Sequence, residues 1–312
     1  MVSLSVIIAA RNEMFLQRTI EDVLENAKGD TEVIAVLDGY WPDPPVKDHP
    51  RVRIIHSTEP RGQRASTNDG ARLSQAKYIM KLDAHCAIDN GFDLKLIARM
   101  RPDWTVVPRM YNLHAFDWEC QKCGHRSYQG RAPSSCEKEC GNTTDFKVVM
   151  VWKPKPKPVG DSMRFDENMQ FQYWEGYKKR QRPRVHRYMV DTMSFLGACW
   201  FMERERYWEL DGLDENHGSW GQVGTEVACK TWLSGGRLCV NQSTWFAHMF
   251  RTGNFRGAFK SGSFPYRISQ SDVDKARQYS RDFWMNDKWP KAKYPLSWLI
   301  DRFAPVPGWD KA

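Results

Sequence analysis

A short segment, YIMKLDAHC at residues 78–86, places an acid and an imidazole directly after an apolar run. The apolar run predicts a buried strand, and Asp83 and His85 then leave it on one face because strand side chains alternate. A carboxylate oxygen and an imidazole nitrogen so placed can bind one divalent cation that also holds a diphosphate. An Asp cap beside a solvent-facing histidine is the alternative interpretation.

Four cysteines are clustered as Cys120-X2-Cys123 and Cys136-X3-Cys140. Two such pairs have the spacing of a small zinc knuckle, in which four thiolates close a tetrahedral structural site and His125 is a less favoured substitute ligand. Two disulfides or unrelated thiols are the alternatives. Thiolates select zinc, whereas carboxylate, imidazole and phosphate suit manganese or magnesium, so we predict two metal sites of different chemistry.

Basic and aromatic residues accompany and follow the cysteine segment. The run KKRQRPRVHR at 178–187 lies beside three aromatic residues, and the formal net charge of the chain is +8. The residues that contribute around these segments are His125, Arg126, Tyr128, Gln129, Arg131, Tyr173, Trp174 and Tyr177. Such a mixture suits phosphate contacts and base stacking, which favours a nucleic-acid partner. A solvated basic surface with a purely stabilising zinc site is the alternative.

The first part of the chain alternates β-rich runs with helical patterns. Strands are predicted at 4–9, 32–37, 52–56 and 78–82, and helices near 16–26 and 64–76. This alternation predicts an α/β fold with a mostly parallel sheet and helices on both of its faces. Ligands of such sheets bind beyond the carboxyl ends of the strands. The polar residues expected there are Arg11, Asn12, Glu13, Asp38, Asp83 and His85.

The middle of the chain interrupts this pattern. Residues 116–150 have little apolar periodicity and are interpreted as an inserted module, and WKPKPKP at 152–158 as an extended polyproline connector. The pattern resumes at about residue 189. Strands are then expected at 195–202 and 237–240, and helices near 205–209, 225–233 and 271–284.

Length and composition indicate a globular protein. The chain has 312 residues, of which 41% are hydrophobic, which is enough for one large α/β domain or two ordinary ones. Its first apolar run is short and is followed at once by charge, so we expect a buried strand with neither signal peptide nor membrane anchor. A reducing cytosol is the expected compartment. Cysteines outside the cluster are then expected as core thiols: Cys86, Cys199, Cys229 and Cys239.

Several segments in order resemble the motifs of one enzyme group: SVIIAARNE, EVIAVLDGY, RGQRASTNDGARLSQAKYIMKLDAHC and WLSGGRLCVNQSTWFAHMFR. This order resembles GT-A glycosyltransferases, and most closely the polypeptide N-acetylgalactosaminyltransferases. The resemblance covers residues 3–112 and 192–266. It implies a GT-A fold with a Rossmann-like sheet, a Mn2+ or Mg2+ ion, and a nucleotide-sugar donor, with uridine diphosphate preferred.

The same resemblance implies roles for individual residues. His248, in AHMFR, would be the third ligand of the metal held by Asp83 and His85, and a core histidine beside Trp245 and Phe246 is the alternative. Asp38 would contact the base and ribose of the donor. Further donor contacts would come from Arg11, Glu13, Arg64, Asn68, Arg251 and Tyr266, although ordinary caps or surface pairs are alternatives for such residues.

The acceptor side resembles the same family with one departure. Gly197 and Ala198 occupy the places of a Gly-small pair that lets backbone approach the sugar in that family. Trp220 and Gly221 match its Trp-Gly element, which precedes a carboxylate-bearing helix. The acidic residue expected two positions after Trp-Gly is replaced by Val223 in WGQVGTE. Glu226 is therefore the nearest candidate for a catalytic base, with Asp83 the other catalytic carboxylate. A residue that stabilises a helix dipole is the alternative for Glu226.

Five segments are expected from these patterns. They are a nucleotide-sugar-binding half at 1–115, a zinc-binding insertion at 116–150, a basic linker or acceptor segment at 151–190, an acceptor and metal-binding half at 191–268, and a helical tail at 269–312.

Three functions remain open from the sequence. The first is a cytoplasmic glycosyltransferase acting on nucleic acid, for example on hydroxymethylated pyrimidines in DNA of the type some bacteriophages make, in which case the compartment is the bacterial host cytoplasm. The base would have to be flipped out or the duplex opened. The second is the same enzyme with a protein, saccharide or lipid-linked acceptor. The third is a zinc-containing nucleic-acid-binding protein whose transferase site is vestigial.

Overall fold

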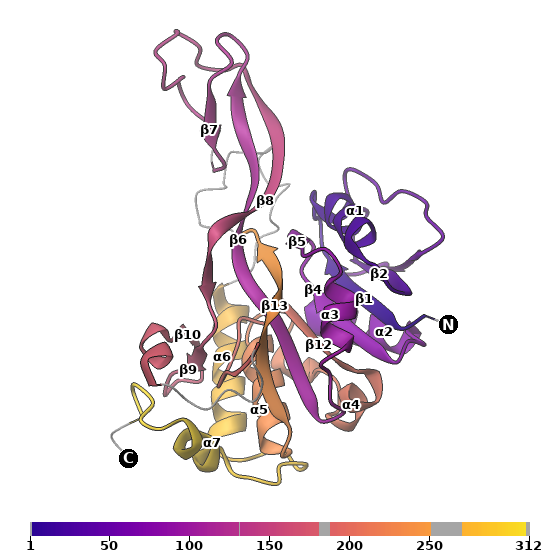
Figure 1. Cartoon of the computed structure of the whole chain (residues 1–312), viewed down its shortest axis with the longest axis vertical. Helices are drawn as coiled ribbons and strands as arrows, with labels where there is room; N and C mark the ends of the chain where they lie inside the picture. The colour runs from indigo at the N-terminus through magenta and orange to yellow at the C-terminus, as the bar shows by residue number, and fades with distance from the viewer. Residues whose placement is uncertain (1, 131, 181–187, 251–269, 310–312) are drawn as a thin grey trace.

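The computed structural model describes residues 2–130, 132–180, 188–250 and 270–309. Its body is a layered arrangement of strands and helices, and a long two-stranded arm projects from it (Figure 1). Among the described helices, none combines the length and the apolar character that crossing a lipid bilayer requires.

A mixed sheet forms the centre of the body. Its strands follow the order β11-β13-β6-β12-β4-β1-β2-β3. Neighbours β4, β1, β2 and β3 run parallel, β6 and β13 also run parallel, and β12 lies antiparallel between these two groups. The strand bounds are β1 Leu4–Ala10, β2 Thr31–Asp38, β3 Val52–Ser57, β4 Tyr78–Leu82, β6 Trp104–Cys120, β11 Met189–Asp191, β12 Cys199–Glu203 and β13 Arg237–His248.

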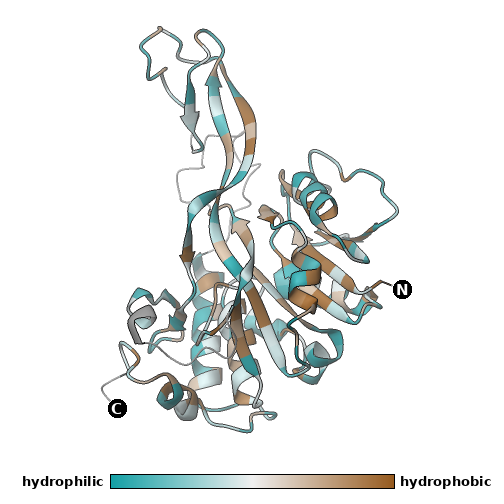
Figure 2. Ribbon diagram, viewed as in Figure 1, coloured by the Kyte–Doolittle hydropathy of each residue, from teal (hydrophilic) through white to brown (hydrophobic). Residues whose placement is uncertain are grey.

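The parallel part arises from short apolar strands that alternate with helices. β1, β2 and β4 are buried along almost their whole length, as strands covered on both faces must be. Helix α1 (Leu16–Asn26) packs against β2 and β5 (Cys86–Ile88), and α2 (Gln63–Leu73) packs against β1 and β2. A short helix, α3 (Phe92–Ile97), leads into β6. The brown strands in Figure 2 show this apolar centre.

The second half of the body surrounds β13. Helix α5 (Val223–Leu233) packs against β13 and β6, and α7 (Leu296–Phe303) packs against α5. The remaining elements are α4 Arg204–Glu209, α6 Gln270–Met285, the 3-10 helices η1 Glu175–Arg180 and η2 Glu215–His217, and a hairpin of β9 Met163–Phe165 and β10 Phe171–Tyr173.

The arm consists of the outer part of β6 paired with β8 (Phe146–Gly160), and β7 (Arg126–Tyr128) pairs with β6 near its tip. This corrects the expectation of a polyproline connector, because residues 152–158 lie inside β8, where Lys153, Pro154 and Pro158 pair with β6. Pro154, Pro156 and Pro158 are compatible with a strand since β8 is at the edge of the sheet, where a missing N–H need not be paired. The expected boundaries at 115/116 and 150/151 fall within β6 and β8.

Most other expected elements are confirmed, α1 and β4 to the residue. The strand expected from residue 195 begins only at Cys199, and the one expected at 237–240 continues to His248. The four cysteines outside the cluster are buried and free, as expected.

Candidate active site

Three side chains from two strand ends converge beyond the carboxyl edge of the sheet. Asp83 and His85 follow β4, and His248 is the last residue of β13. Nε2 of His248 lies 3.2 Å from Oδ2 of Asp83 and 3.0 Å from Nε2 of His85. His248 is far from Asp83 and His85 in sequence, but it lies beside them because β13 pairs with β5, which places His248 opposite Cys86.

Neighbouring groups fix the orientation of these three residues. Oε2 of Glu13 lies 3.0 Å from Nδ1 of His85, so the other ring nitrogen faces Asp83 and His248. Glu13 is buried and follows β1, so it is placed to orient the His85 imidazole in the way that outer carboxylates orient imidazoles at metal sites. Gln63 donates from Nε2 to Oδ1 of Asp83 at 3.2 Å.

A buried lysine controls the charge of Asp83. Nζ of Lys81 contacts the Asp83 carboxylate and donates to the carbonyl oxygen of Gly197 at 2.9 Å. Burial opposes ionisation of Asp83, but the Lys81 ammonium and the His248 imidazole outweigh it and hold the pKa of this carboxyl far below its usual value. Asp83 is therefore a carboxylate at neutral pH.

This geometry fits a divalent cation. The three ligand atoms lie within 4.8 Å of one another. Two ligands at right angles on an ion with bonds of about 2.1 Å are separated by about 3 Å, close to the distances found here. One carboxylate and two imidazoles leave coordination positions for oxygen atoms of a substrate, and this mixed donor set suits Mn2+ or Mg2+ better than a thiolate site does.

A narrow polar pocket adjoins Asp83 and His85 on the side of β1 and β2. It has a volume of about 80 Å3, and its lining includes Arg11, Glu13, Asp38, Ser66, Asp83 and His85. Asp38 accepts hydrogen bonds from Nε of Arg11 at 2.8 Å and from the backbone N–H groups of Arg61 and Gly62 at 2.5 and 3.0 Å. Asp38 thereby holds the segment before α2 against the end of β2. Arg11 and Asp38 are brought together as the sequence suggested, as an ion pair with each other.

Ser66 is the group in this pocket that points to a ligand. Its side chain is 1% exposed, and no described residue hydrogen-bonds to its Oγ. A buried hydroxyl without a partner costs free energy, so a polar ligand atom in the pocket would offset that cost.

Ser66→Ala is therefore expected to weaken the binding of a nucleotide donor by about 3- to 10-fold, the effect of one hydrogen bond worth about 0.5–1.5 kcal/mol. The expected signature is a raised KM for the donor with little change in kcat. Isothermal titration of uridine diphosphate with Mn2+ measures the binding step directly. Ser135→Ala, on the arm, is the matched control, and equal affinity of both variants would remove Ser66 from the donor site.

A larger pocket lies on the other side of the same three residues. Its volume is about 590 Å3, and Asp83, His85 and Trp220 line both pockets. Its wall is built mainly from the segment before β12 and the start of α5, and it includes Gly197, Ala198, Trp220, Val223, Gly224, Thr225, Phe250 and Arg277. Asp83 is the sole carboxylate among the described lining residues.

Two glycines make this wall possible. Gly197 has a φ of +91°, a left-handed conformation, and a Cβ at this position would lie 2.7 Å from the backbone N of Gly224. A Cβ on Gly224 would lie 1.9 Å from the carbonyl oxygen of Phe195. The backbone of the Gly197–Ala198 segment therefore packs directly on the first turn of α5. Gly197, Ala198 and Trp220 are brought to the pocket as the resemblance implied.

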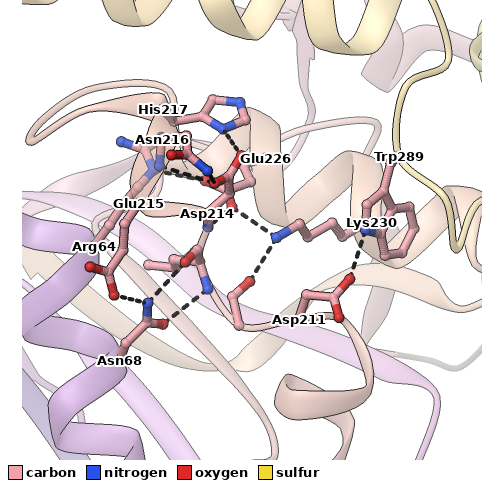
Figure 3. Close-up of polar contacts among 12 residues, drawn as sticks. Arg64, Asn68, Asp211, Asp214, Glu215, Asn216, His217, Glu226, Lys230 and Trp289 are labelled. Atoms are coloured by element: carbon pink, nitrogen blue, oxygen red, sulfur yellow. Dashed lines mark hydrogen bonds and ion pairs between the residues drawn. The ribbon is translucent and has the colours of Figure 1, made fainter.

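Glu226 lies in a buried polar network and not at the pocket where a catalytic base was expected (Figure 3). Its side chain is fully buried one turn into α5 and is absent from the described lining of the pocket. Its Oε2 accepts from Nε of Arg64 at 2.9 Å, and its Oε1 accepts from Nζ of Lys230 at 2.9 Å. Burial opposes ionisation of Glu226, but the Lys230 ammonium, the Arg64 guanidinium and nearby groups outweigh it and lower the pKa of Glu226 to about 2.

Arg64 and Asn68 also face this buried network and not the nucleotide pocket. Arg64 donates to the carbonyl oxygens of Gly218 and Gly221 at 3.0 and 2.8 Å. Asn68 donates from Nδ2 to the carbonyl oxygen of Leu213 at 2.9 Å. The two side chains are one helical turn apart on α2 and hold the loop before α5, which carries Trp220. Neither lines the two pockets described above.

The four clustered cysteines meet at the tip of the arm. Sγ of Cys120 lies 3.6 Å from Sγ of Cys140, and Sγ of Cys123 lies 3.5 Å from Sγ of Cys136. All four sulfur atoms lie within 4.8 Å of one another. Tetrahedral zinc with bonds of about 2.3 Å places its sulfur ligands about 3.8 Å apart, so the cluster fits that ion. Asn142 donates to Sγ of Cys120 at 3.1 Å and so supports the site.

Some residues at the site were not predicted from the sequence, and some predicted residues lie outside the described parts of the chain. Lys81, Gln63 and Ser66 were not expected. A lysine inside an otherwise apolar strand was the available signal for Lys81, and the spacing of three between Gln63 and Ser66 places both on one face of α2. Arg251, Tyr266 and most of the basic run at 178–187 lie outside the described residues.

Comparison with known proteins shows what this chain is similar to. Residues 5–136 match the model of glycosyl transferase family 2. Over 261 residues the chain is 26% identical to polypeptide N-acetylgalactosaminyltransferase 6 of Bos taurus, and over 264 residues 26% identical to polypeptide N-acetylgalactosaminyltransferase 3 of Homo sapiens. Each match covers 80% of this chain but 37% of the relative, so the chain spans little more than a third of their length.

A solved structure shares the fold. The crystal structure of GalNAc-T7 with UDP, GalNAc and Mn2+ superposes with a TM-score of 0.62 at 16% identity, covering 97% of this chain and 54% of that one. The chain therefore shares the GT-A-like fold of that structure, and its first part is similar to the glycosyl transferase family 2 model.

Proposed function

We propose that this chain is a metal-dependent glycosyltransferase that uses a nucleoside-diphosphate sugar, preferably a uridine diphosphate sugar. The observation that carries the proposal is the convergence of Asp83, His85 and His248 at the junction of two pockets. One pocket is narrow and polar, with an unpartnered Ser66 hydroxyl, and the other is wide enough for sugar and acceptor groups. The named relatives are N-acetylgalactosaminyltransferases, and the structural neighbour was crystallised with UDP and Mn2+.

The residues divide into three roles under this proposal. Asp83, His85 and His248 hold the cation, which when bound supplies positive charge to a leaving diphosphate. Glu13 and Lys81 keep the first two of these ligands oriented and ionised. Arg11, Asp38 and Ser66 form the nucleoside side of the site, while Gly197, Ala198 and Trp220 face the sugar.

Donor turnover tests the proposal directly. The protein is incubated with Mn2+ and a panel of uridine diphosphate sugars, and release of uridine diphosphate is followed with and without EDTA. Metal-dependent release above the rate without enzyme supports the proposal. Its absence with every sugar and every divalent ion would favour the vestigial site, in which the chain only binds nucleic acid.

We also propose that the cysteine cluster holds a structural zinc ion. The four sulfur atoms have the required separations. Cys120 and Cys136 are buried, whereas β7 contributes only three residues to the local sheet. In such small units, metal binding contributes folding free energy directly.

Cys136→Ser is therefore expected to lower bound zinc from about one ion per chain to near zero and to expose the tip of the arm to proteolysis. Elemental analysis and limited trypsin digestion measure the two effects. Cys229→Ser, which alters a buried thiol in the body, is the control and should keep its zinc. A Cys136→Ser variant with full zinc content would contradict the assignment.

For the acceptor, we propose a hydroxyl on nucleic acid, such as that of a hydroxymethylated pyrimidine in DNA, modified in the cytoplasm. The net charge of +8 and the lysines of the arm support this choice. A polypeptide hydroxyl is the second candidate, favoured by the names of the relatives. Transfer assays with hydroxymethylated DNA, ordinary DNA and a Ser/Thr-rich peptide distinguish them, because digestion of the product shows a mass gain on a nucleoside or on the peptide.

A further inference from the structure

Strand β8 on the arm carries a one-sided charge. Between Phe146 and Gly160 it has four lysines and no acidic residue. Lys147, Lys153 and Lys157 are exposed, and Lys155 is half-buried. Among the described residues, no ion pair includes any of the four, whereas several cations of the body, such as Lys47 and Lys95, are paired with carboxylates.

Protection of the sheet edge explains part of this pattern. Lysines and prolines on an edge strand prevent pairing with other chains. That explanation does not account for the way Lys155 is held. Its Nζ lies 4.1 Å from the ring centroid of Tyr128 on β7, and the His114 ring lies 4.7 Å from the same Tyr128 ring. The ammonium is thus fixed in advance, which reduces the entropy lost when it binds an anion.

The position of the lysines relates them to the candidate active site. On β6, Asn112 pairs with His248 of β13, and the next residues, Leu113 and His114, pair with Pro154 and Lys153 of β8. The lysine segment therefore begins two strands from a metal-binding residue, about 10 Å at ordinary strand spacing. An extended polymer lying along β8 would be led toward the pocket.

The chemistry of β8 also limits the kind of polymer. Pro154, Pro156 and Pro158 have no N–H groups, so the outer edge of this segment cannot bind a peptide as an added strand. What it offers instead is a series of point charges. Phosphodiester groups are bound by such charges without any need for backbone hydrogen bonds.

We propose that Lys153, Lys155 and Lys157 form a docking surface for the phosphodiester backbone of a nucleic-acid acceptor. The proposal rests on the proposed function, in that it assigns a binding surface to the acceptor of the same site. It names nucleic acid as the partner, and an acidic polypeptide is the competing outcome of the test.

The test compares full-length wild type with a variant in which Lys153, Lys155 and Lys157 are all changed to glutamine. Binding of a fluorescein-labelled single-stranded DNA oligonucleotide is measured by anisotropy between 50 and 200 mM KCl. Losing three phosphate contacts lowers the slope of log K against log salt by about 2 and weakens binding about 100-fold at 0.1 M salt. The control variant changes three exposed lysines of the body, Lys28, Lys275 and Lys293, to glutamine, and it should bind like wild type.

The outcomes are distinct. Equal weakening in both triple variants would mean that only net charge matters and would overturn the proposal, as would tighter binding of a polyglutamate peptide than of DNA. Metal-dependent hydrolysis of the donor without acceptor should be unchanged in the arm variant, which shows that it is folded. DNA binding through the arm without any transfer to DNA would support the docking surface and refute the nucleic-acid acceptor.

Discussion

Changing His248 to alanine is expected to reduce metal-dependent donor turnover by about 1,000-fold. The variant loses one of three convergent ligand atoms, and the cation contributes several kcal/mol to stabilising charge on the leaving group. The affinity for Mn2+ should fall by at least about 100-fold, since losing even an outer-shell partner typically costs 10- to 100-fold. Turnover measured across a Mn2+ titration separates weaker binding from a lower limiting rate.

A graded series makes this prediction sharper. His248→Asp replaces the imidazole nitrogen with a carboxylate oxygen, which can also bind Mn2+, and should retain part of the Mn2+ affinity that His248→Ala loses. His49→Ala is the control, because His49 precedes the amino end of β3 and accepts a hydrogen bond from the backbone N–H of Arg51. Full Mn2+-dependent turnover by His248→Ala would show that the three side chains do not share an ion.

The parallel half of the fold was predictable because its strands and helices are short and separated by clear turn signals. The apolar run before Asp83 ends where β4 ends, and the helix expected at 16–26 is α1. Asp83 and His85 both follow β4, but they lie in the turn between β4 and β5, so strand alternation does not explain their approach. Only the resemblance predicted that His248 would meet these two residues. Its approach depends on the antiparallel pairing of β13 with β5, which no local pattern in the sequence indicates.

The arm shows where local patterns mislead. Alternating lysine and proline is typical of an extended linker, and nothing local distinguishes a linker from an edge strand with one paired side. The pairing partner is β6, whose own apolar residues continue beyond the body: Leu113, Ala115, Phe116 and Trp118 pack with Trp152 in a second apolar cluster. That cluster depends on contacts between segments about 40 residues apart, which periodicity does not reveal.

The buried network around Glu226 shows a second limit. A carboxylate near the start of a helix suggests either a surface residue or a catalytic base, because sequence alone does not show which cations meet it. One partner was visible at helical spacing, Lys230 four residues later, but Arg64 comes from α2. Figure 3 shows that these side chains enclose the carboxylate, with the backbone of Asp214 completing the set.

Glu226→Gln is expected to lower the free energy of unfolding by about 3–5 kcal/mol, the usual effect of removing one partner of a buried ion pair. Arg64 and Lys230, both nearly fully buried, would lose the opposing charge. Urea denaturation followed by tryptophan fluorescence measures the change. Glu25→Gln is the control. The Glu25 side chain is 62% exposed and its ion pair with Arg18 is long, at 3.7 Å, so this substitution should change the free energy of unfolding by less than about 0.5 kcal/mol.

The pH dependence of stability gives an independent check. The pKa of Glu226 is lowered from 4.5 to about 2 in the folded chain, so the carboxylate stabilises the fold fully above pH 4.5 and loses that effect as the pH falls toward 2. The difference in stability between wild type and Glu226→Gln should therefore narrow across this range and stay constant above it.

Activity distinguishes a positioning role from a catalytic one. Arg64, which Glu226 holds, also binds the carbonyl oxygens of Gly218 and Gly221 on either side of Trp220. Loss of Glu226 should then loosen the loop that lines both pockets, raising the donor KM more than it lowers kcat. A stable Glu226→Gln protein with normal KM and a kcat reduced by orders of magnitude would instead place Glu226 in the chemical step, and its burial would have to be relieved when substrate binds.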